Sequence, residues 1–375
     1  MPPINLLIKP ASSACNMRCS YCFYNAIAQN RENAFEGMMS LDTLETIVKE
    51  ALETAEGHCS FAFQGGEPTL RGLDFYKSLI VMVKKYNQKK LSVNYAIQTN
   101  GILIDDQWAT FLAENHFLVG LSLDGPEEIH NLNRRMQNDD VSYNNVIKAA
   151  RLMTKHKVDF NILCVVTGRG AKRIEKIYNF FKKQGYQYIQ FIPCLEPLET
   201  KRGTSDFSLS IKEFEAYLIT LFDLWYNDFV KGKYISIRHI DNLINMIRGI
   251  PPELCSMTGC CTVQYVVEGD GGVYPCDFYV YDHWRLGTIG KDSLVEMRNN
   301  DIAKRFIEES FVLPAKCASC IHLSLCRNGC RRDRVEEEKI NYYCEAWENF
   351  FNYAIPKMQH VIFMLNSGYY NNYKD

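Results

Sequence analysis

Short runs rich in Val, Ile, Phe and Tyr alternate with longer stretches of helical hydrophobic periodicity from the N-terminus to about residue 240. The predicted strands cover residues 5–9, 59–64, 92–99, 118–123, 160–166 and 188–193. The predicted helices cover residues 41–55, 73–86, 106–114, 143–156, 172–184 and 212–230, with Ser40 and Ser210 as N-caps of the first and last. A strand-helix unit repeated about six times predicts a parallel sheet with right-handed crossovers.

Both a doubly wound sheet and a barrel satisfy this repeat, and the placement of polar residues separates them. Nearly every predicted strand is followed by a polar or Gly-rich segment, as at residues 65–68, 100–101, 124–125 and 194–196. Loops of this kind gathered at one rim are typical of a barrel. About six units rather than eight predict a partial (β/α)6 TIM-like barrel, open on one side and wide enough for a large substrate.

The pattern changes after Pro251-Pro252. Residues 263–268 and 272–280 alternate like two short strands joined by a Gly-Asp-Gly turn, which predicts a β-hairpin, and a cysteine-rich tract follows. We therefore expect two domains in this α/β protein. The barrel would cover residues 1–240, and a small metal-built domain with a C-terminal helix would cover residues 241–375.

Composition limits the classes of partner. The chain has 375 residues, of which 47% are hydrophobic, and its formal charge of -2 leaves no excess for binding a phosphate backbone or an anionic membrane. No apolar run reaches the length of a bilayer-spanning helix, and the N-terminus lacks the features of a secretory signal. We expect a cytoplasmic protein that binds neither nucleic acid nor membrane.

Fifteen cysteines are the unusual feature of the composition. In a reducing compartment they should not form disulfides, and metal ligation is the remaining use that explains so many. Cys59, Cys164 and Cys194 lie inside apolar stretches and are predicted to be core residues. The others gather in two groups, one near the start of the chain and one between Cys255 and Cys344.

The first group is Cys15-x3-Cys19-x2-Cys22, in the loop after the first predicted strand. Three thiolates can hold a [4Fe-4S] cluster and leave one iron open to a small chelating molecule. S-adenosylmethionine can fill that position with its amino and carboxylate groups, which brings its sulfonium next to a reductant. Spacing alone leaves open a zinc site made of three cysteines and a distant ligand.

The aromatic residue before the third cysteine and the Gly-Gly-Glu-Pro loop at residues 65–68 accompany this spacing. Together they resemble the radical S-adenosylmethionine superfamily. The resemblance implies that the cofactor's amino group meets backbone carbonyls near Gly66, where the absence of a β-carbon permits close approach. The cofactor-binding residues implied by the resemblance are Tyr21, Gly66, Ser122, Arg134, for which Arg135 is the rival, and Leu195 on the adenine side.

The second group supplies eight thiolates, enough for two complete sites, and two zinc ions could also staple such a domain. Gly271-x4-Cys276 before the tract resembles the SPASM extension of radical enzymes that modify peptides, which carries two auxiliary [4Fe-4S] clusters. That resemblance assigns Cys255, Cys261, Cys276 and Cys330 to one cluster and Cys317, Cys320, Cys326 and Cys344 to the other. Cys260 next to Cys261 leaves the register open by one residue.

Among SPASM enzymes the sequence is most similar to the anaerobic sulfatase-maturating enzymes. The similarity rests on residues 7–13, 60–68, 98–101 and, above all, on Tyr-Pro-Cys-Asp-Phe-Tyr at 274–279. It implies oxidation of a cysteine or serine in a sulfatase Cys/Ser-x-Pro-x-Arg motif to Cα-formylglycine. The expected partners are therefore an unfolded or nascent sulfatase polypeptide and an electron donor such as flavodoxin or ferredoxin.

This chemistry assigns a role to each part. The 5′-deoxyadenosyl radical would take a hydrogen atom from the target β-carbon, a base would take the thiol or hydroxyl proton, and the leftover electron would leave through an auxiliary cluster. Asp277 is the predicted base because it directly follows the predicted ligand Cys276. Tyr24 and Gln64, next to the cofactor motifs, are the predicted substrate contacts.

Two alternatives remain at this point. Another SPASM enzyme that forms a thioether or a crosslink on a precursor peptide would share the same motifs. A non-catalytic metal scaffold or electron carrier would share the cysteine-rich tract, but it gives no reason for a three-cysteine site beside Gly-Gly-Glu-Pro.

Overall fold

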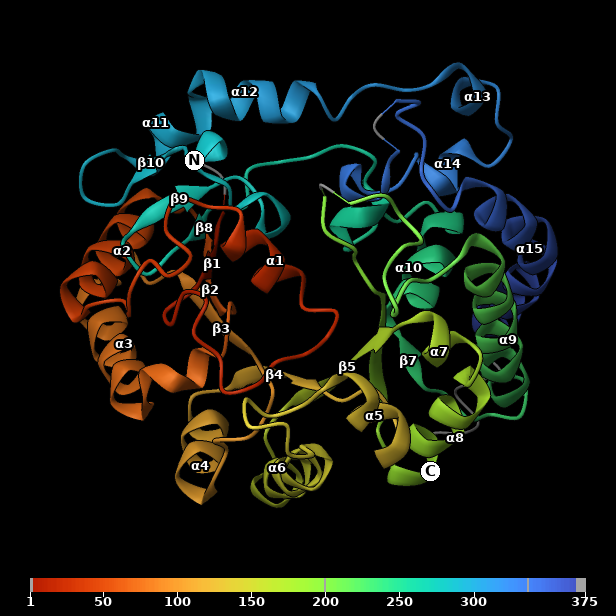
Figure 1. Ribbon diagram of the computed structural model, residues 1–375, viewed down its shortest axis with the longest axis horizontal. Helices are drawn as coiled ribbons and strands as arrows, with labels where there is room; N and C mark the ends of the chain where they lie inside the picture. Colours follow the sequence, from red (N-terminus) through yellow and green to blue (C-terminus); the bar gives the residue numbers. More distant parts are fainter. Residues whose placement is uncertain (1–2, 199, 336, 369–375) are drawn as a thin grey trace. The chain divides into compact units, whose positions relative to one another are not determined.

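The computed structural model describes residues 3–198, 200–335 and 337–368 (Figure 1). The chain divides into two compact units, each made of segments that are separate in the sequence. The first unit comprises Met1–Leu123, Asn131–Phe160 and Thr262–Glu308, and the second comprises Asp124–His130, Asn161–Cys261 and Glu309–Asp375. The predicted division at residue 240 follows the sequence pattern rather than compactness, and it stays a prediction.

The first unit contains four parallel strands in chain order: β1 (Ile4–Ile8), β2 (His58–Phe63), β3 (Ser92–Thr99) and β4 (Phe117–Ser122). Ile8 lies opposite Phe63, and Phe63 lies opposite Ile97. Alternate residues of β2 are buried, as expected for a strand with one face in the core. The predicted parallel pairing is confirmed, so the loops that follow β1, β2 and β3 lie at one edge of the sheet.

The predicted hairpin is present, but its strands are shorter than expected: β8 (Val266–Val267) and β9 (Gly272–Tyr274). β8 begins only after Tyr265, whose φ of 49° is left-handed, and β9 ends before Pro275, which has no N–H to donate to a sheet. β8 also pairs in parallel with β1, and β10 (Gly287–Thr288) pairs antiparallel with β9. The hairpin therefore extends the sheet of the first unit beyond β1.

Helices cover the first unit: α1 (Phe23–Gln29), α2 (Leu41–Thr54), α3 (Leu73–Tyr86), α4 (Asp106–Glu114), α6 (Tyr143–His156), α11 (Leu294–Asn299) and α12 (Asp301–Glu308), with 3-10 turns η1 (Pro68–Arg71), η3 (Asp277–Tyr279) and η4 (Asp282–Trp284). α2 and α3 lie side by side along the sheet (Figure 1). The predicted N-cap of α2 is confirmed, because the Ser40 hydroxyl accepts a hydrogen bond from the Thr43 amide at 3.0 Å.

The second unit has its own parallel strands, β5 (Phe160–Val166), β6 (Tyr188–Pro193) and β7 (Ser236–Ile237). β7 was not predicted, because two residues are too few to show a hydrophobic period. The helices of this unit are α7 (Gly168–Ala171), α8 (Ile174–Gln184), α9 (Ile211–Phe229), α10 (Arg238–Ile247), α13 (Ala315–Ala318), α14 (Leu323–Cys326) and α15 (Cys344–Asn366), with 3-10 turns η2 (Cys255–Met257) and η5 (Arg331–Asp333). Helix α5 (Glu127–Asn133) has residues in both units.

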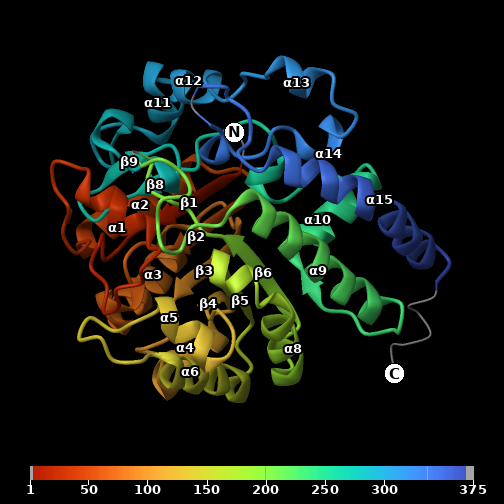
Figure 2. The ribbon, with the colours of Figure 1, turned by 45° about the vertical axis from the view of Figure 1, so that its right-hand side comes forward.

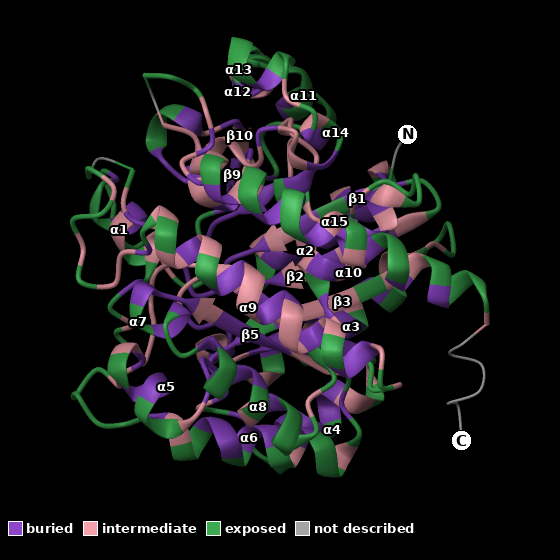
Figure 3. Ribbon diagram, turned by 90° about the vertical axis from the view of Figure 1, so that its right-hand side faces the viewer, coloured by how far each residue is buried: buried purple, intermediate pink, exposed green. Residues whose placement is uncertain are grey.

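The long helices α9 and α15 pack side by side in the second unit (Figure 2). Ser210 forms the predicted cap of α9, completed by Glu213 into a capping box. The ring centroids of Phe222 and Phe350 are 5.7 Å apart in this contact. Buried and exposed stripes alternate around α9 (Figure 3), as expected for a helix with one face in the core.

Cys59, Cys164 and Cys194 are buried, which agrees with their predicted place in the core.

No helix in the described part of the chain combines the length and the apolar character needed to cross a membrane.

Candidate active site

The loop that carries Cys15, Cys19 and Cys22 connects β1 to α1, and Cys22 is the residue before the first turn of α1. Burial raises the pKa of the Cys15 thiol to about 12, and the charges of Glu67, Cys19 and Cys22 act in the same direction. The three thiols are therefore close enough to affect one another. Because metals bind the thiolate form, this grouping favours a site in which bound iron offsets the negative charges.

The loop after β2 is docked on the backbone just before Cys15. The Gly66 amide donates to the Ser12 carbonyl at 2.8 Å, and the Glu67 amide donates to the Ala14 carbonyl at 2.7 Å. A β-carbon on Gly66 would lie 2.0 Å from the Ala14 oxygen. Because only glycine permits this close approach, Gly66 allows the two loop amides to form these hydrogen bonds with the cysteine loop.

Glu67 joins the β2 and β3 ends, a role that was not predicted from the sequence. Its buried carboxylate accepts hydrogen bonds from the Thr69 hydroxyl at 2.6 Å, from the Thr99 hydroxyl at 2.8 Å and from the Asn100 amide at 2.8 Å. Burial raises the pKa of this carboxyl, although the hydrogen bonds oppose the shift. The Asn100 side chain in turn donates to the Asn16 side chain at 2.8 Å and lies 3.9 Å from the Cys15 sulfur.

The segment around Arg134 pairs with the cysteine loop. The Ser20 amide donates to the Asn133 carbonyl at 3.0 Å. Arg134 is buried, and its guanidinium carbon lies 5.4 Å from the centroid of the Tyr21 ring. Arg135 is only half-buried and reaches the Asp139 carbonyl at 3.3 Å. These positions favour Arg134 over Arg135 as the cofactor ligand.

Ser122 ends β4 in the first unit and is half-buried. Leu195 follows β6 in the second unit and is also half-buried. Their roles in cofactor binding stay predictions.

Asp277, the predicted base, begins the turn η3 and is buried. One of its carboxylate oxygens lies 2.5 Å from the Lys9 ammonium, and the other accepts a hydrogen bond from the Gln64 side chain at 2.8 Å. Gln64 and Asp277, both predicted site residues, are therefore brought together. Lys9, at the end of β1, was missed; its signal in the sequence was a lysine directly after an apolar strand.

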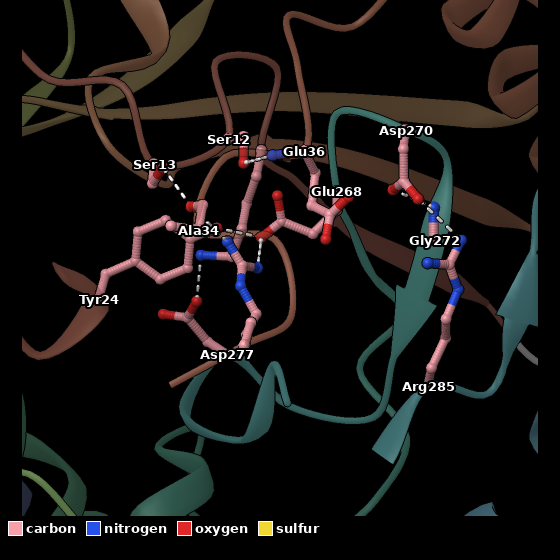
Figure 4. A network of polar contacts seen from close by, with 12 residues as sticks. Ser12, Ser13, Tyr24, Ala34, Glu36, Glu268, Asp270, Gly272, Asp277 and Arg285 are labelled. Carbon is pink, nitrogen blue, oxygen red and sulfur yellow. Dashed lines mark hydrogen bonds and ion pairs between the residues drawn. The ribbon is translucent and has the colours of Figure 1, made fainter. Parts of the chain in front are cut away.

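Tyr24, the other predicted substrate contact, points toward the same place (Figure 4). Its hydroxyl donates to the buried carboxylate of Glu268, which also receives Arg31 Nη1 at 3.0 Å. Burial, followed by the charge of Glu268, raises the pKa of the Tyr24 hydroxyl well above its ordinary value. Tyr24 therefore remains a donor, and neither Arg31 nor Glu268 had a local sequence signal for this role.

The cysteines of the second unit form two groups. Cys255 and Cys261 act electrostatically on Cys330, whose thiol pKa is raised mainly by burial. The other group, Cys317, Cys320, Cys326 and Cys344, lines one cavity. Among the described residues, no three His, Cys, Asp or Glu side chains lie close enough to hold a single metal ion, so the fit to clusters rests on these two groupings.

Known proteins resemble both parts of the chain. A model of the radical SAM superfamily matches residues 10–181, and a model of an iron-sulfur cluster-binding domain, SPASM, matches residues 259–321. The cysteine-type anaerobic sulfatase-maturating enzyme of Clostridium perfringens is 48% identical over 96% of this chain and 99% of its own length. The chain belongs to the anaerobic sulfatase-maturating enzymes.

Two further comparisons place this member of the sulfatase-maturating family. The serine-type enzyme of Bacteroides thetaiotaomicron is 32% identical over 95% of this chain and 90% of its own length. The solved structure of native anSMEcpe with bound AdoMet and Cp18Cys peptide is 47% identical, covers 96% of this chain and 99% of its own, and superposes with a TM-score of 0.92. The predicted fold class, a partial radical SAM barrel followed by a SPASM domain, is confirmed.

The residues of this sulfatase-maturating family member fit the cofactors of the family. Three grouped thiols and the docked Gly-Gly loop fit a cluster that binds S-adenosylmethionine, and the cavity of four thiols fits a fully ligated cluster. The assignment of each cysteine, including Cys276 in the first unit, stays a prediction.

We predict that Gly66→Ala removes S-adenosylmethionine cleavage and the iron of the N-terminal cluster, because a β-carbon would overlap the Ala14 carbonyl. Iron content and 5′-deoxyadenosine formation after anaerobic reconstitution measure the effect. Gly170→Ala is the matched control, since the nearest atom to its added carbon would lie 3.6 Å away. Normal cleavage by Gly66→Ala would show that the close backbone contact is dispensable.

A second prediction separates the neighbouring cysteines. Cys261 lies near Cys255, and its amide donates a hydrogen bond to the Ser310 hydroxyl at 2.8 Å. At Cys260, the backbone carbonyl accepts a hydrogen bond from the Thr258 hydroxyl at 2.9 Å. Cys261→Ala should therefore lose the iron of one auxiliary cluster, and Cys260→Ala should keep it. Iron loss in Cys260→Ala alone would show that Cys260 is the ligand. Equal iron loss in both variants would contradict the prediction that only Cys261 is a ligand.

Proposed function

We propose that this chain oxidises a cysteine in the Cys-x-Pro-x-Arg motif of a sulfatase polypeptide to Cα-formylglycine under anaerobic conditions. The observation that carries the proposal is the 48% identity to a cysteine-type maturating enzyme over nearly the full length of both chains. The lower identity of 32% to a serine-type enzyme favours cysteine over serine as the target. The alternative of thioether or crosslink formation gains no support from these relatives.

The reaction removes two electrons and two protons from the target side chain. When bound, S-adenosylmethionine would supply a 5′-deoxyadenosyl radical able to take one hydrogen atom from the β-carbon, and an auxiliary cluster would provide an acceptor for the leftover electron. The thiol proton passes to Asp277. The carbon-sulfur double bond that results exchanges its sulfur for the oxygen of water, and hydrogen sulfide leaves.

The surroundings of Asp277 support its role as the base. Its carboxylate faces one cationic and one neutral donor, Lys9 and Gln64, and the side chain is 10% exposed. A general base must lie within hydrogen-bond reach of the proton that it takes, so partners that hold the carboxylate in one orientation support this role. Tyr24 and Gln64 stay predicted substrate contacts, and in this structure each also has a partner within the protein.

The expected partners are an unfolded or nascent sulfatase polypeptide and a reduced flavodoxin or ferredoxin as electron donor. The cytoplasmic location, and the absence of nucleic-acid and membrane partners, stay predictions.

We predict that the anaerobically reconstituted and reduced protein converts a peptide with the Cys-x-Pro-x-Arg motif to its formylglycine form, faster than the serine counterpart. Mass spectrometry of the peptide and chromatography of 5′-deoxyadenosine follow the two products. Unchanged peptide mass beside active cofactor cleavage would reject the maturase function and keep the superfamily assignment.

Asp277→Asn should keep all iron and cleave S-adenosylmethionine but lose most peptide oxidation, by roughly 100-fold or more, because an amide cannot take the thiol proton. Asp282→Asn, in the next turn of the same segment, is the matched control. Near-normal formylglycine yield in Asp277→Asn would remove Asp277 from this role.

A further inference from the structure

Lys9 is a buried lysine at the end of β1 with no accessible surface on its side chain. The position of the Lys9 side chain explains why the first residue of the Gly-Gly-Glu-Pro loop, Gly65, is a glycine. A β-carbon on Gly65 would lie 2.9 Å from both the β- and γ-carbons of Lys9, and Gly65 has a left-handed φ of 104°. The loop therefore leaves room for a lysine that the core would otherwise exclude.

The ammonium of Lys9 has a well-defined set of neighbours. It lies 2.5 Å from one carboxylate oxygen of Asp277 and 3.8 Å from the centroid of the Tyr24 ring. Burial of an ammonium costs free energy unless a counter-charge compensates it, and Asp277 supplies that charge. The aromatic face adds a second favourable contact that is strongest when water is excluded.

A second set of buried groups holds these neighbours in place. The Tyr24 hydroxyl donates to Glu268, and Arg31 makes a buried ion pair with the same carboxylate. Glu268 directly follows β8, which pairs with β1, and the Lys9 amide donates to the Val267 carbonyl at 2.8 Å. Lys9 and Glu268 are thereby set in register by the backbone, and the two cations balance the two anions.

We propose that Lys9 is a positioning residue for the base Asp277, with Tyr24, Glu268 and Arg31 as the group that holds Lys9. Lys9 fixes one oxygen of the carboxylate while Gln64 fixes the other, so the carboxylate is held in one orientation. Lys9 and Gln64, the two residues that bind the Asp277 carboxylate, directly follow the adjacent strands β1 and β2. This inference rests on the proposed function only for the identity of the reaction.

The test is Lys9→Met, which keeps the length of the side chain and removes its charge. Peptide oxidation should fall by roughly 10–100-fold, because a displaced catalytic group loses most of its effect. Cleavage of S-adenosylmethionine should continue, so the ratio of 5′-deoxyadenosine to formylglycine rises. Lys84→Met, at an exposed position on α3, should leave that ratio unchanged. A proportional fall of both products, or no fall, would overturn the proposal.

A double-mutant cycle separates positioning from general damage. If Lys9 acts through Asp277, then Lys9→Met should cause little further loss of formylglycine in the Asp277→Asn background. Losses that multiply would assign Lys9 a role independent of Asp277. The double variant removes both buried charges and leaves neither uncompensated, so it remains usable if Lys9→Met alone folds poorly.

A structural readout makes the inference independent of turnover. In a crystal structure of Lys9→Met, or of Lys9→Gln if that variant is better folded, the Asp277 carboxylate should leave its place beside Gln64. An unchanged contact between Asp277 and Gln64 would refute the positioning role. Absence of formylglycine from the wild-type protein would instead reject the proposed function, and the position of the carboxylate would still test Lys9.

Discussion

The close backbone contact between Gly66 and Ala14 is the constraint on which the rest of the candidate site depends. Two amides of the β2 loop donate to the residues just before Cys15, so the cysteine loop is fixed to the sheet edge without any side chain between them. Glu67 carries the same connection on to the end of β3 through Thr99 and Asn100. Three neighbouring strand ends are thereby joined into one support, which is the arrangement a reactive cofactor requires for accurate placement.

Buried charges form the second feature of the site, and stability alone does not explain them. The pairs Lys9–Asp277 and Arg31–Glu268 are almost completely removed from water. Replacement of such a pair by apolar residues is often neutral or favourable, whereas loss of one partner costs roughly 3–5 kcal/mol. Their presence beside the candidate base is therefore better explained by the need to orient a carboxylate than by the free energy of folding.

The hairpin connects the two family segments of the chain. Residues 10–181 match the radical SAM superfamily and residues 259–321 match the SPASM domain, yet Asp277 and Glu268 from the second segment lie against Lys9, Tyr24 and Arg31 from the start of the chain. The parallel pairing of β8 with β1 makes this possible, because it sets Val267 opposite Ile8. Asp277, the predicted base, follows the predicted cluster ligand Cys276 and is thus delivered to the strand end that precedes the first cysteine loop. Proton removal and electron removal would then occur close together.

Local patterns in the sequence determined much of this protein. The strand-helix order, the caps Ser40 and Ser210, the three-cysteine loop and the Gly-Gly-Glu-Pro loop all depend on residues close together in the chain, where spacing reflects geometry directly. Asp277 was found because it adjoins a cysteine. Only the tertiary structure decided that Lys9, Arg31 and Glu268 lie together beside Asp277 and Tyr24, and that Arg134 rather than Arg135 is buried beside Tyr21. The physical reason is that a contact between residues up to 268 positions apart depends on strand order and register, which no local spacing encodes.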